Sequence, residues 1–240
     1  MTTFDERPAR PLAVVTGAAS GIGEACVGLL IDRGWSVIAI DIDAAGLHRG
    51  QTGPWAGSDV RTITVDLRDL RGAIAAIDAE IEADRPVDAL LNIAGMYHET
   101  TVEDFDPEIA LDILRVNTLA PQALSYALWN RFAKNGCIVN AGSQSIGVFI
   151  PDAVTYTASK GGLAALTFAM QGTAGDSGLR IYCINFGQVR TPMYEAALNE
   201  EVPYATPEET AEEVFACIEG GRRGREGIMY PFTSPPKTNR

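Results

Sequence analysis

Three residues of the chain, Ser143, Tyr156 and Lys160, have the types and the spacing to carry out proton transfer. Tyr156 and Lys160 begin a helical pattern, and a separation of four residues places the phenol and the ammonium on one face, one turn apart. A phenol ionises near pH ~10, and a nearby ammonium stabilises its anion. Ser143, at the end of the preceding predicted strand, offers a hydroxyl that could hold a substrate oxygen beside the tyrosine. The set predicts acid–base chemistry at a substrate oxygen.

A glycine-rich turn follows the first apolar run and opens directly into a helical pattern. Its sequence is Thr16-Gly17-Ala-Ala-Ser20-Gly21-Ile22-Gly23. Glycines permit a tight turn and a close approach of the backbone to a pyrophosphate, whose charge then lies at the helix N-terminus. An ordinary strand-to-helix turn can have the same residues, so the turn predicts a dinucleotide site only together with its context.

Asp41 supplies that context, because it ends the second predicted strand, 18 residues past Gly23. A carboxylate at this place can accept hydrogen bonds from both ribose hydroxyls of an adenosine, and it would repel the extra phosphate of a 2′-phosphorylated cofactor. Neither Ser20 nor Ile42 is basic, so no side chain at these positions could neutralise such a phosphate. The pattern favours NAD over NADP. The alternative is a surface aspartate in a turn before Asp43.

Short apolar runs alternate with longer helical patterns along the chain. Runs that are apolar throughout and separated by helices indicate a parallel sheet covered on both faces. The fold class is therefore α/β, a Rossmann-type doubly wound parallel sheet of about seven strands with helices on both faces, in a single domain spanning 1–240. The sequence predicts strands at 11–16, 36–40, 61–65, 87–92, 136–141, 179–185 and 227–230, and helices at 22–33, 67–83, 107–132, 154–172 and, after a capping box at Thr206, from Pro207.

The composition excludes several classes of partner. The 240 residues include 19 Lys plus Arg and 31 Asp plus Glu, for a net charge of −12. Nucleic acid and anionic membrane would be repelled by such a surface. No apolar run approaches the ~18 residues of a membrane helix, and we expect a cytoplasmic protein. No pair of cysteines has the spacing of a zinc site or a disulfide scaffold, so no metal is expected, and four core thiols are predicted at Cys26, Cys137, Cys183 and Cys217.

Taken together, the glycine turn and the Ser143, Tyr156 and Lys160 set resemble the classical short-chain dehydrogenase/reductase family over about residues 11–192. The resemblance implies reversible hydride transfer between NAD and a secondary alcohol or its carbonyl compound, with Tyr156 as the acid–base group. It adds Asn117 to the catalytic set, as the residue that holds a water in a proton relay. The implied cofactor contacts are Gly17, Ser20, Gly21, Ile22, Gly23, Asp41, Ile42, Asp66, Leu67, Asn92, Ala94, Gly95, Tyr156, Lys160, Gly187, Val189 and Thr191.

Within this resemblance, Asp66 would cap the adenine ring, the segment from Asn92 to Gly95 would lie under the cofactor, and Val189 and Thr191 would bind the nicotinamide carboxamide. Lys160 would lower the pKa of Tyr156 and bind the nicotinamide ribose. The predicted substrate contacts are Ser143, Ser145, Phe149, Tyr156, Phe186 and Met193, with Met96, Tyr97, Gln144 and Tyr194 as further candidates for the pocket wall.

The chain also departs from the family pattern. Phe186 precedes Gly187 where the family has proline, Tyr182 replaces a usual asparagine, and the usual Asp-Gly-Gly at the end of the final strand is missing. Residues 1–10 form an N-terminal extension, 193–206 a short substrate lid that favours a bulky or cyclic alcohol, and 233–240 a tail.

Two other functions are compatible with parts of the pattern. A dinucleotide-binding sensor without catalysis needs only the glycine turn, and the intact catalytic set argues against it. A related dehalogenase would have a turn rebuilt for halide, which Gly17, Gly21, Gly23 and Lys160 oppose. The family resemblance further implies a homo-oligomer, a tetramer or a dimer.

Overall fold

The computed structural model describes residues 10–101, 103–148, 150–197, 203, 205–220 and 227–229. Several sequence predictions lie outside these residues: the N-terminal extension up to residue 9, the pocket candidate Phe149, much of the proposed lid and the tail.

Within these residues, seven parallel strands form one sheet in the order β3-β2-β1-β4-β5-β6-β7. The order reverses between β1 and β4, as in a doubly wound sheet. The predicted fold class is confirmed. The strands are β1 (Leu12–Thr16), β2 (Ser36–Asp41), β3 (Val60–Thr64), β4 (Val87–Asn92), β5 (Phe132–Ser143), β6 (Arg180–Phe186) and β7 (Gly227–Met229).

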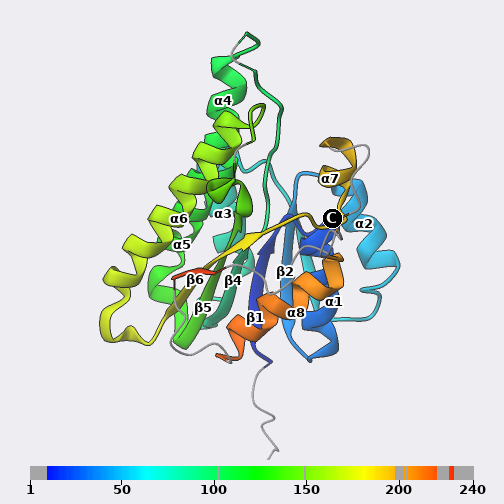
Figure 1. Cartoon of the computed structure of the whole chain (residues 1–240). Coiled ribbons are helices and arrows are strands. Elements are labelled where there is room, and N and C mark those ends of the chain that lie inside the picture. The colour runs from blue at the N-terminus through cyan, green and yellow to red at the C-terminus, as the bar shows by residue number, and fades with distance from the viewer. Residues whose placement is uncertain are drawn as a thin grey trace, which may run out of the picture.

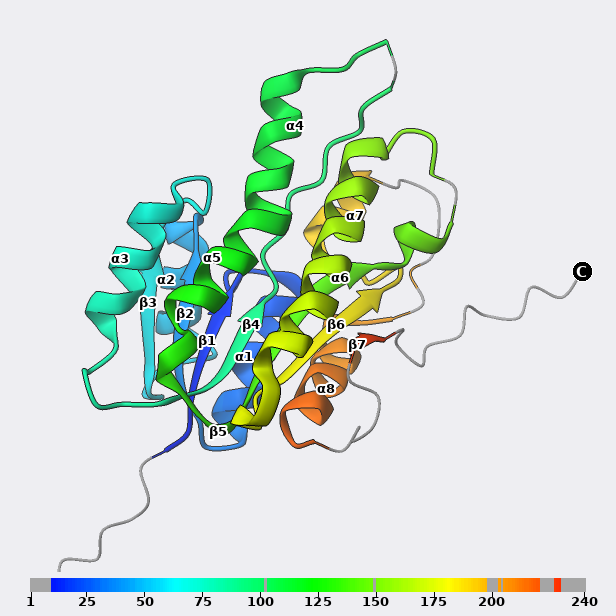
Figure 2. The same cartoon turned by 90° about the vertical axis from the view of Figure 1, so that its left-hand side faces the viewer.

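Helices cover both faces of the sheet, giving three layers (Figure 1 and Figure 2). One face packs against α1, α2 and α8, and the other against α3, α5 and α6. Successive residues of β1 alternate between these two apolar cores, which explains why the strand is apolar throughout. The helices are α1 (Gly21–Asp32), α2 (Ala44–Thr52), α3 (Leu70–Glu80), α4 (Pro107–Leu114), α5 (Ala120–Ala127), α6 (Val154–Ala174), α7 (Pro192–Ala197) and α8 (Pro207–Ile218).

The stretch predicted as helical at 107–132 is helical over most of its length, but it is not one regular helix. A π-helical turn, Arg115–Leu119, separates α4 from α5, and a 3-10 turn at Trp129–Arg131 leads into β5. Pro121 has no N–H to donate to the carbonyl four residues earlier, so a regular α-helical ladder cannot continue through this point. Instead the N–H of Ala120 donates to the carbonyl of Arg115, a wider turn that faces Asn117 inward.

The sequence prediction lacks two of the helices and is correct for the N-terminal cap of α8. The sequence reading did not predict α2, which follows Asp43, or α7, which lies inside the proposed lid. Thr206 makes both hydrogen bonds of the capping box: its hydroxyl accepts from the Glu209 N–H, and its own N–H donates to the Glu209 carboxylate. All four cysteines are free and buried, as expected.

Candidate functional site

The predicted site residues gather at the carboxyl ends of the central strands. The glycine turn follows β1, Asp41 ends β2, the 93–97 loop follows β4, Ser143 ends β5 and Phe186 ends β6. In doubly wound sheets the crevice beside the strand-order reversal is where ligands bind. Sequence segments up to 170 residues apart are therefore brought to the position at which a ligand is expected.

The glycine turn leaves no room for side chains. Gly17 has a φ of +71°, and a Cβ there would lie 2.8 Å from the backbone of Ala94. A Cβ on Gly23 would overlap the carbonyl of Gly17, and one on Gly21 would lie 3.0 Å from Thr191 Cγ2. Ser20, the residue before α1, makes no side-chain capping hydrogen bond. The turn has the bare backbone and the helix N-terminus that a pyrophosphate requires.

Asp41 accepts one backbone hydrogen bond on each carboxylate oxygen, from Ala19 N at 3.0 Å and from Asp43 N at 2.9 Å. The structure therefore contains the turn before Asp43 that the alternative interpretation of Asp41 predicts. It does not exclude ribose binding, because each carboxylate oxygen can accept a second hydrogen bond. Ile42 beside it is 59 % exposed, which places an apolar surface next to the carboxylate.

Asp66 has a partner that the sequence reading missed. Its carboxylate forms an ion pair with Arg68, whose Nη2 lies 2.6 Å from Oδ2, and Arg68 also pairs with Asp112 at 3.1 Å. Hydrogen bonding from Arg68 lowers the pKa of Asp66. The sequence signal for this ion pair is the presence of opposite charges two residues apart, at Asp66 and Arg68. Contact of Asp66 and Leu67 with adenine stays a prediction, and any such contact would share the carboxylate with Arg68.

Ser143, Tyr156 and Lys160 lie together, as the spacing predicted. Ser143 lies beside the phenol of Tyr156, and its Oγ accepts a hydrogen bond from Ser145 N at 3.1 Å. Lys160 Nζ lies 5.6 Å from the centre of the Tyr156 ring and donates to the carbonyl of Ala141 at 2.7 Å. The phenol can therefore share a substrate oxygen with Ser143 while the amine stays fixed behind it.

Burial changes the pKa of both titratable groups. It raises the pKa of Tyr156, against the lowering effect of the Ser143 hydrogen bond. It lowers the pKa of Lys160 from 10.5 to about 8. Burial outweighs the opposing effect in the protein alone, and the expectation that Lys160 lowers the pKa of Tyr156 stays a prediction.

The buried amine predicts a pH-dependent cost to stability that Lys160→Met removes. Between the folded pKa of about 8 and the unfolded value of 10.5 the unfolded chain binds more protons, so Lys160 costs stability below pH 8 and the cost fades as pH rises to 10.5. After allowing for the lost bond to Ala141, we expect the variant to be more stable by about 1–2 kcal/mol at pH 7. Denaturant unfolding of the parent and the variant at pH 7 and pH 10 measures the difference in their free energies of unfolding. A difference that is as large at pH 10 as at pH 7 would contradict the prediction.

Asn117 lies on the π-helical turn and is fully buried. Its Nδ2 donates to the carbonyl of Met96 at 2.9 Å and to Ser159 Oγ at 2.9 Å, and its Oδ1 accepts from Met96 N at 2.7 Å. Both side-chain donors are thus used within the protein. The predicted role in a water relay stays a prediction.

Asn92, at the end of β4, is almost fully buried. Its amide donates to Asn140 Oδ1 at 2.8 Å; Asn140 in turn donates to Thr167, and Thr167 to the carbonyl of Leu163. This polar chain crosses from β4 through β5 to α6 beneath the site. Cofactor contact by the segment from Asn92 to Gly95 stays a prediction.

The predicted pocket residues divide into two groups. Phe186 is almost fully buried, in an apolar core that includes residues of α1 and α8, and Tyr182 is buried in the same core. Contact of Phe186 with substrate stays a prediction. Tyr97 does reach the site: its ring packs edge-on against that of Tyr156 at 5.1 Å. Met193, on α7, is half-exposed, and its Cε would lie 3.8 Å from a Cβ on Gly95.

Of the remaining candidates, Ser145 is buried beside Ser143. Val189 is buried and pairs with Ala205, and Thr191 Oγ1 accepts from the N–H of Tyr194 at 3.2 Å. Ala94 donates its N–H to Thr16 Oγ1 at 3.2 Å. The structure places Gln144 in the turn after β5 and Gly187 directly after β6. Contacts of these residues with cofactor or substrate stay predictions.

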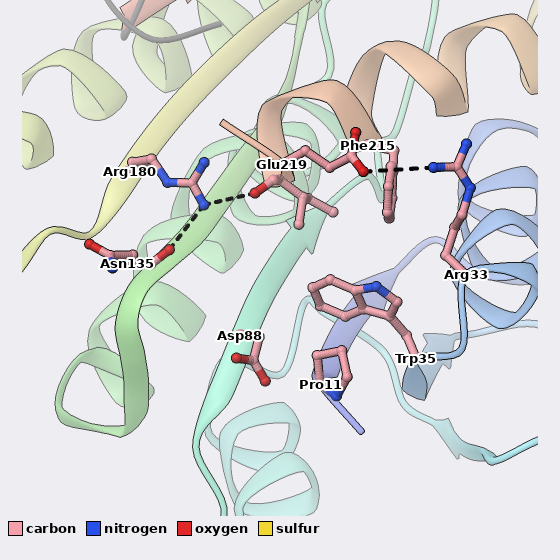
Figure 3. A pocket seen from close by; sticks show the side chains of 9 residues that line it. Pro11, Arg33, Trp35, Asp88, Asn135, Arg180, Phe215 and Glu219 are labelled. Carbon is pink, nitrogen blue, oxygen red and sulfur yellow. Dashed lines mark hydrogen bonds and ion pairs between the residues drawn. The ribbon is translucent and has the colours of Figure 1, made fainter. Parts of the chain in front are cut away.

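A separate pocket of about 410 Å³ opens at the opposite edge of the sheet, near the amino ends of the strands (Figure 3). Its two arginines are engaged within the protein: Arg180 donates to the carbonyls of Asn135, Cys217 and Ile218, and Arg33 pairs with Glu219 at 3.7 Å. The Arg180 bonds satisfy carbonyls at the C-terminal end of α8. We assign this pocket a structural role.

Comparison with known proteins agrees with this geometry. Residues 11–202 match the family described as short chain dehydrogenase. The chain belongs to the short-chain dehydrogenase family. Among similar members of this family, 2-(R)-hydroxypropyl-CoM dehydrogenase of Xanthobacter autotrophicus is 32 % identical over 199 residues, which cover 79 % of this chain and 78 % of that protein. D-threitol dehydrogenase of Mycolicibacterium smegmatis is 32 % identical over 189 residues, covering 76 % of this chain and 71 % of that one.

Among solved structures, 4-hydroxyisoleucine dehydrogenase complexed with NADH superposes with a TM-score of 0.82 at 25 % identity, covering 92 % of this chain and 96 % of that chain. In the part of this chain that the structure describes, no helix is both long and apolar enough to cross a membrane. The same residues contain no cluster of metal-ligating side chains.

Proposed function

We propose that the protein is an NAD-dependent oxidoreductase that interconverts a secondary alcohol and its carbonyl compound. The observation that carries this is the placement of Ser143 beside the phenol of Tyr156, with Lys160 behind it, at the same sheet edge as the glycine turn and Asp41. NAD, when bound, supplies the acceptor or donor of the hydride. The printed names of the relatives, dehydrogenases of hydroxylated compounds, support an alcohol substrate.

The residues of the site divide the proton chemistry between them. In alcohol oxidation the phenolate of Tyr156 takes the proton of the substrate hydroxyl, and Ser143 donates a hydrogen bond to the substrate oxygen. Lys160, fixed by Ala141, presents an ammonium that stabilises the phenolate and would bind a ribose hydroxyl of the cofactor. Asn117 would pass the proton outward through water.

The turn after β1 fits the pyrophosphate of NAD, because its glycines let the backbone approach closely where it leads into the N-terminus of α1. Asp41 would accept hydrogen bonds from the adenosine ribose, and the exposed side chain of Ile42 would pack on the adenine. An ordinary dinucleotide assay tests the function: NAD plus a panel of secondary alcohols, including threitol, should produce absorbance from reduced cofactor. Binding of NAD with no turnover of any alcohol would favour the sensor.

Replacing Asp41 should change cofactor preference. Asp41→Ala removes both the ribose acceptor and the charge that repels a 2′-phosphate, so we expect KM for NAD to rise about tenfold and the preference for NAD over NADP to fall at least about tenfold. The measurement is kcat/KM for NAD and for NADP with one alcohol. Asp43→Ala, which removes a neighbouring exposed carboxylate paired with Arg49, is the control. An unchanged preference in Asp41→Ala would rule out this role.

We further propose a cytoplasmic homo-oligomer, a dimer or a tetramer. Large apolar side chains are exposed on the outer faces of the helices that cover one side of the sheet: Phe168 on α6 is 70 % exposed and Tyr126 on α5 is 52 % exposed. Exposed aromatic side chains of this kind are typical of subunit contacts. Gel filtration should give a mass at least twice 25.6 kDa; a monomer would contradict the proposal.

A further inference from the structure

Ser159 lies in α6 between Tyr156 and Lys160, and its hydroxyl joins two hydrogen bonds. It donates to the carbonyl of Tyr156 at 2.6 Å and accepts from Asn117 Nδ2 at 2.9 Å. The residue is completely buried. Since a buried amide donor is costly to leave unpaired, the hydroxyl is a required partner for Asn117. It connects the catalytic turn of α6 with the π-helical turn.

The connection extends beyond Asn117 to the loop after β4. The carboxamide of Asn117 also binds both the N–H and the carbonyl of Met96. Thr118, the next residue, donates its hydroxyl to the carbonyl of Ser159 at 2.8 Å. Met96, Asn117, Ser159 and Tyr156 thus form one continuous chain of hydrogen bonds across three segments of the fold.

The loop held at the Met96 end contacts the reacting groups directly. Tyr97 packs against the ring of Tyr156 at 5.1 Å, with the two rings at 77°. The absent side chain of Gly95 leaves space beside Lys160 Nζ, which is 3.5 Å from the position of a Cβ there. A shift of this loop relative to α6 would therefore act directly on the ring of Tyr156 and on the space beside Lys160 Nζ.

We infer that Ser159 is a positioning residue, which fixes the Tyr156 turn against the 95–97 loop in the reaction proposed above. It touches neither substrate nor cofactor in this role and acts through Asn117 and Tyr156. Misplacement of a reacting group by 1 Å can cost about 10²-fold in rate. The loss of one of several constraints on Tyr156 should cost less, about tenfold in kcat.

Ser159→Ala is the test, and α6 offers a matched control. Thr167, about two turns further along the same helix, is also fully buried; its hydroxyl accepts from Asn140 Nδ2 at 2.9 Å and donates to Leu163 O at 2.8 Å. Thr167→Val removes a buried hydroxyl that likewise joins two hydrogen bonds, but at a distance from Tyr156. Both variants should lose thermal stability. Only Ser159→Ala should lower kcat, by about tenfold, and shift the pH profile of kcat. Its KM for NAD should stay within twofold of the parent value. Ser159→Thr, which keeps a hydroxyl, should restore most of kcat.

Hydrogen exchange provides a readout without activity. The N–H of Met96 is held by Asn117 Oδ1. It should exchange at least about fivefold faster in Ser159→Ala than in the original protein and be unchanged in Thr167→Val. Equal kcat and pH profiles in Ser159→Ala and Thr167→Val, or unchanged exchange at Met96 in Ser159→Ala, would overturn the inference. A parent protein that oxidises no alcohol would instead refute the proposed function, and the exchange measurement would still test the coupling.

Discussion

Tyr156→Phe is expected to lower kcat for alcohol oxidation about 10³-fold. The substitution removes the one hydroxyl that the proposed reaction uses as acid and base, a role that contributes about 10²–10⁴-fold in enzymes. The ring and its edge-on contact with Tyr97 remain, and the glycine turn is untouched. The Kd for NAD should therefore stay within about twofold. Steady-state kinetics and NADH fluorescence titration measure the two quantities.

Tyr97→Phe is the matched control, because it removes a phenol hydroxyl beside the same site and preserves the ring contact. Charge on Tyr97 also raises the pKa of Tyr156, and the phenolate of Tyr156 is the active form in alcohol oxidation, so this variant should shift the rising, acidic limb of the kcat profile to lower pH. Its kcat should fall less than about tenfold. Wild-type turnover by Tyr156→Phe across a range of alcohols would refute the catalytic assignment.

Gly23→Ala is expected to abolish detectable NAD binding at millimolar concentrations, a loss of at least about 10²-fold in affinity. A methyl group on Gly23 would overlap the carbonyl of Gly17, so the turn and the first residues of α1 would have to move apart. The backbone amides that would bind the pyrophosphate would move with them. Isothermal titration with NAD, with circular dichroism to verify folding, measures the effect.

Gly28→Ala controls for the change of residue type in the same helix. A Cβ on Gly28 would meet no atom within 4 Å, and alanine favours a helix interior over glycine by about 0.5–1 kcal/mol. This variant should bind NAD normally and be slightly more stable than the parent. Normal NAD affinity in a folded Gly23→Ala protein would show that the turn does not bind the pyrophosphate.

Much of the site could be predicted because its signals are local. The glycines at 17, 21 and 23 form a short pattern between a strand and a helix, and the spacing of Tyr156 and Lys160 is one helical turn. The steric reason for glycine is local only at Gly23, which faces Gly17, whereas Gly17 and Gly21 face the distant residues Ala94 and Thr191. Asp41 was identified because the end of a parallel strand is a fixed place in the sheet. The sheet itself followed from strands that are apolar throughout, since both faces are covered.

The features of the site that the sequence did not predict depend on contacts between segments that are distant in the chain. The break between α4 and α5 could have been suspected from Pro121, but the inward position of Asn117 follows from its bonds to Met96 and Ser159. Phe186 was proposed as a pocket residue from its place at the end of the strand, and the sequence did not predict that its side chain is buried in the apolar core shared with α1 and α8. The raised pKa of Tyr156 reflects burial, a quantity that spacing does not contain.

The polar chain from Asn92 through Asn140 to Thr167 has a consequence for how this chain can diverge from its relatives. Each of the three side chains is a hydrogen-bond partner of a buried neighbour. A mutation to an apolar residue at any one position therefore leaves a buried polar group without its partner for as long as the other two positions stay polar. Apolar residues at all three positions would remove the defect, but a lineage would have to acquire them nearly together. We expect these three positions to covary among close homologues, and this covariation would mark the boundary between subfamilies.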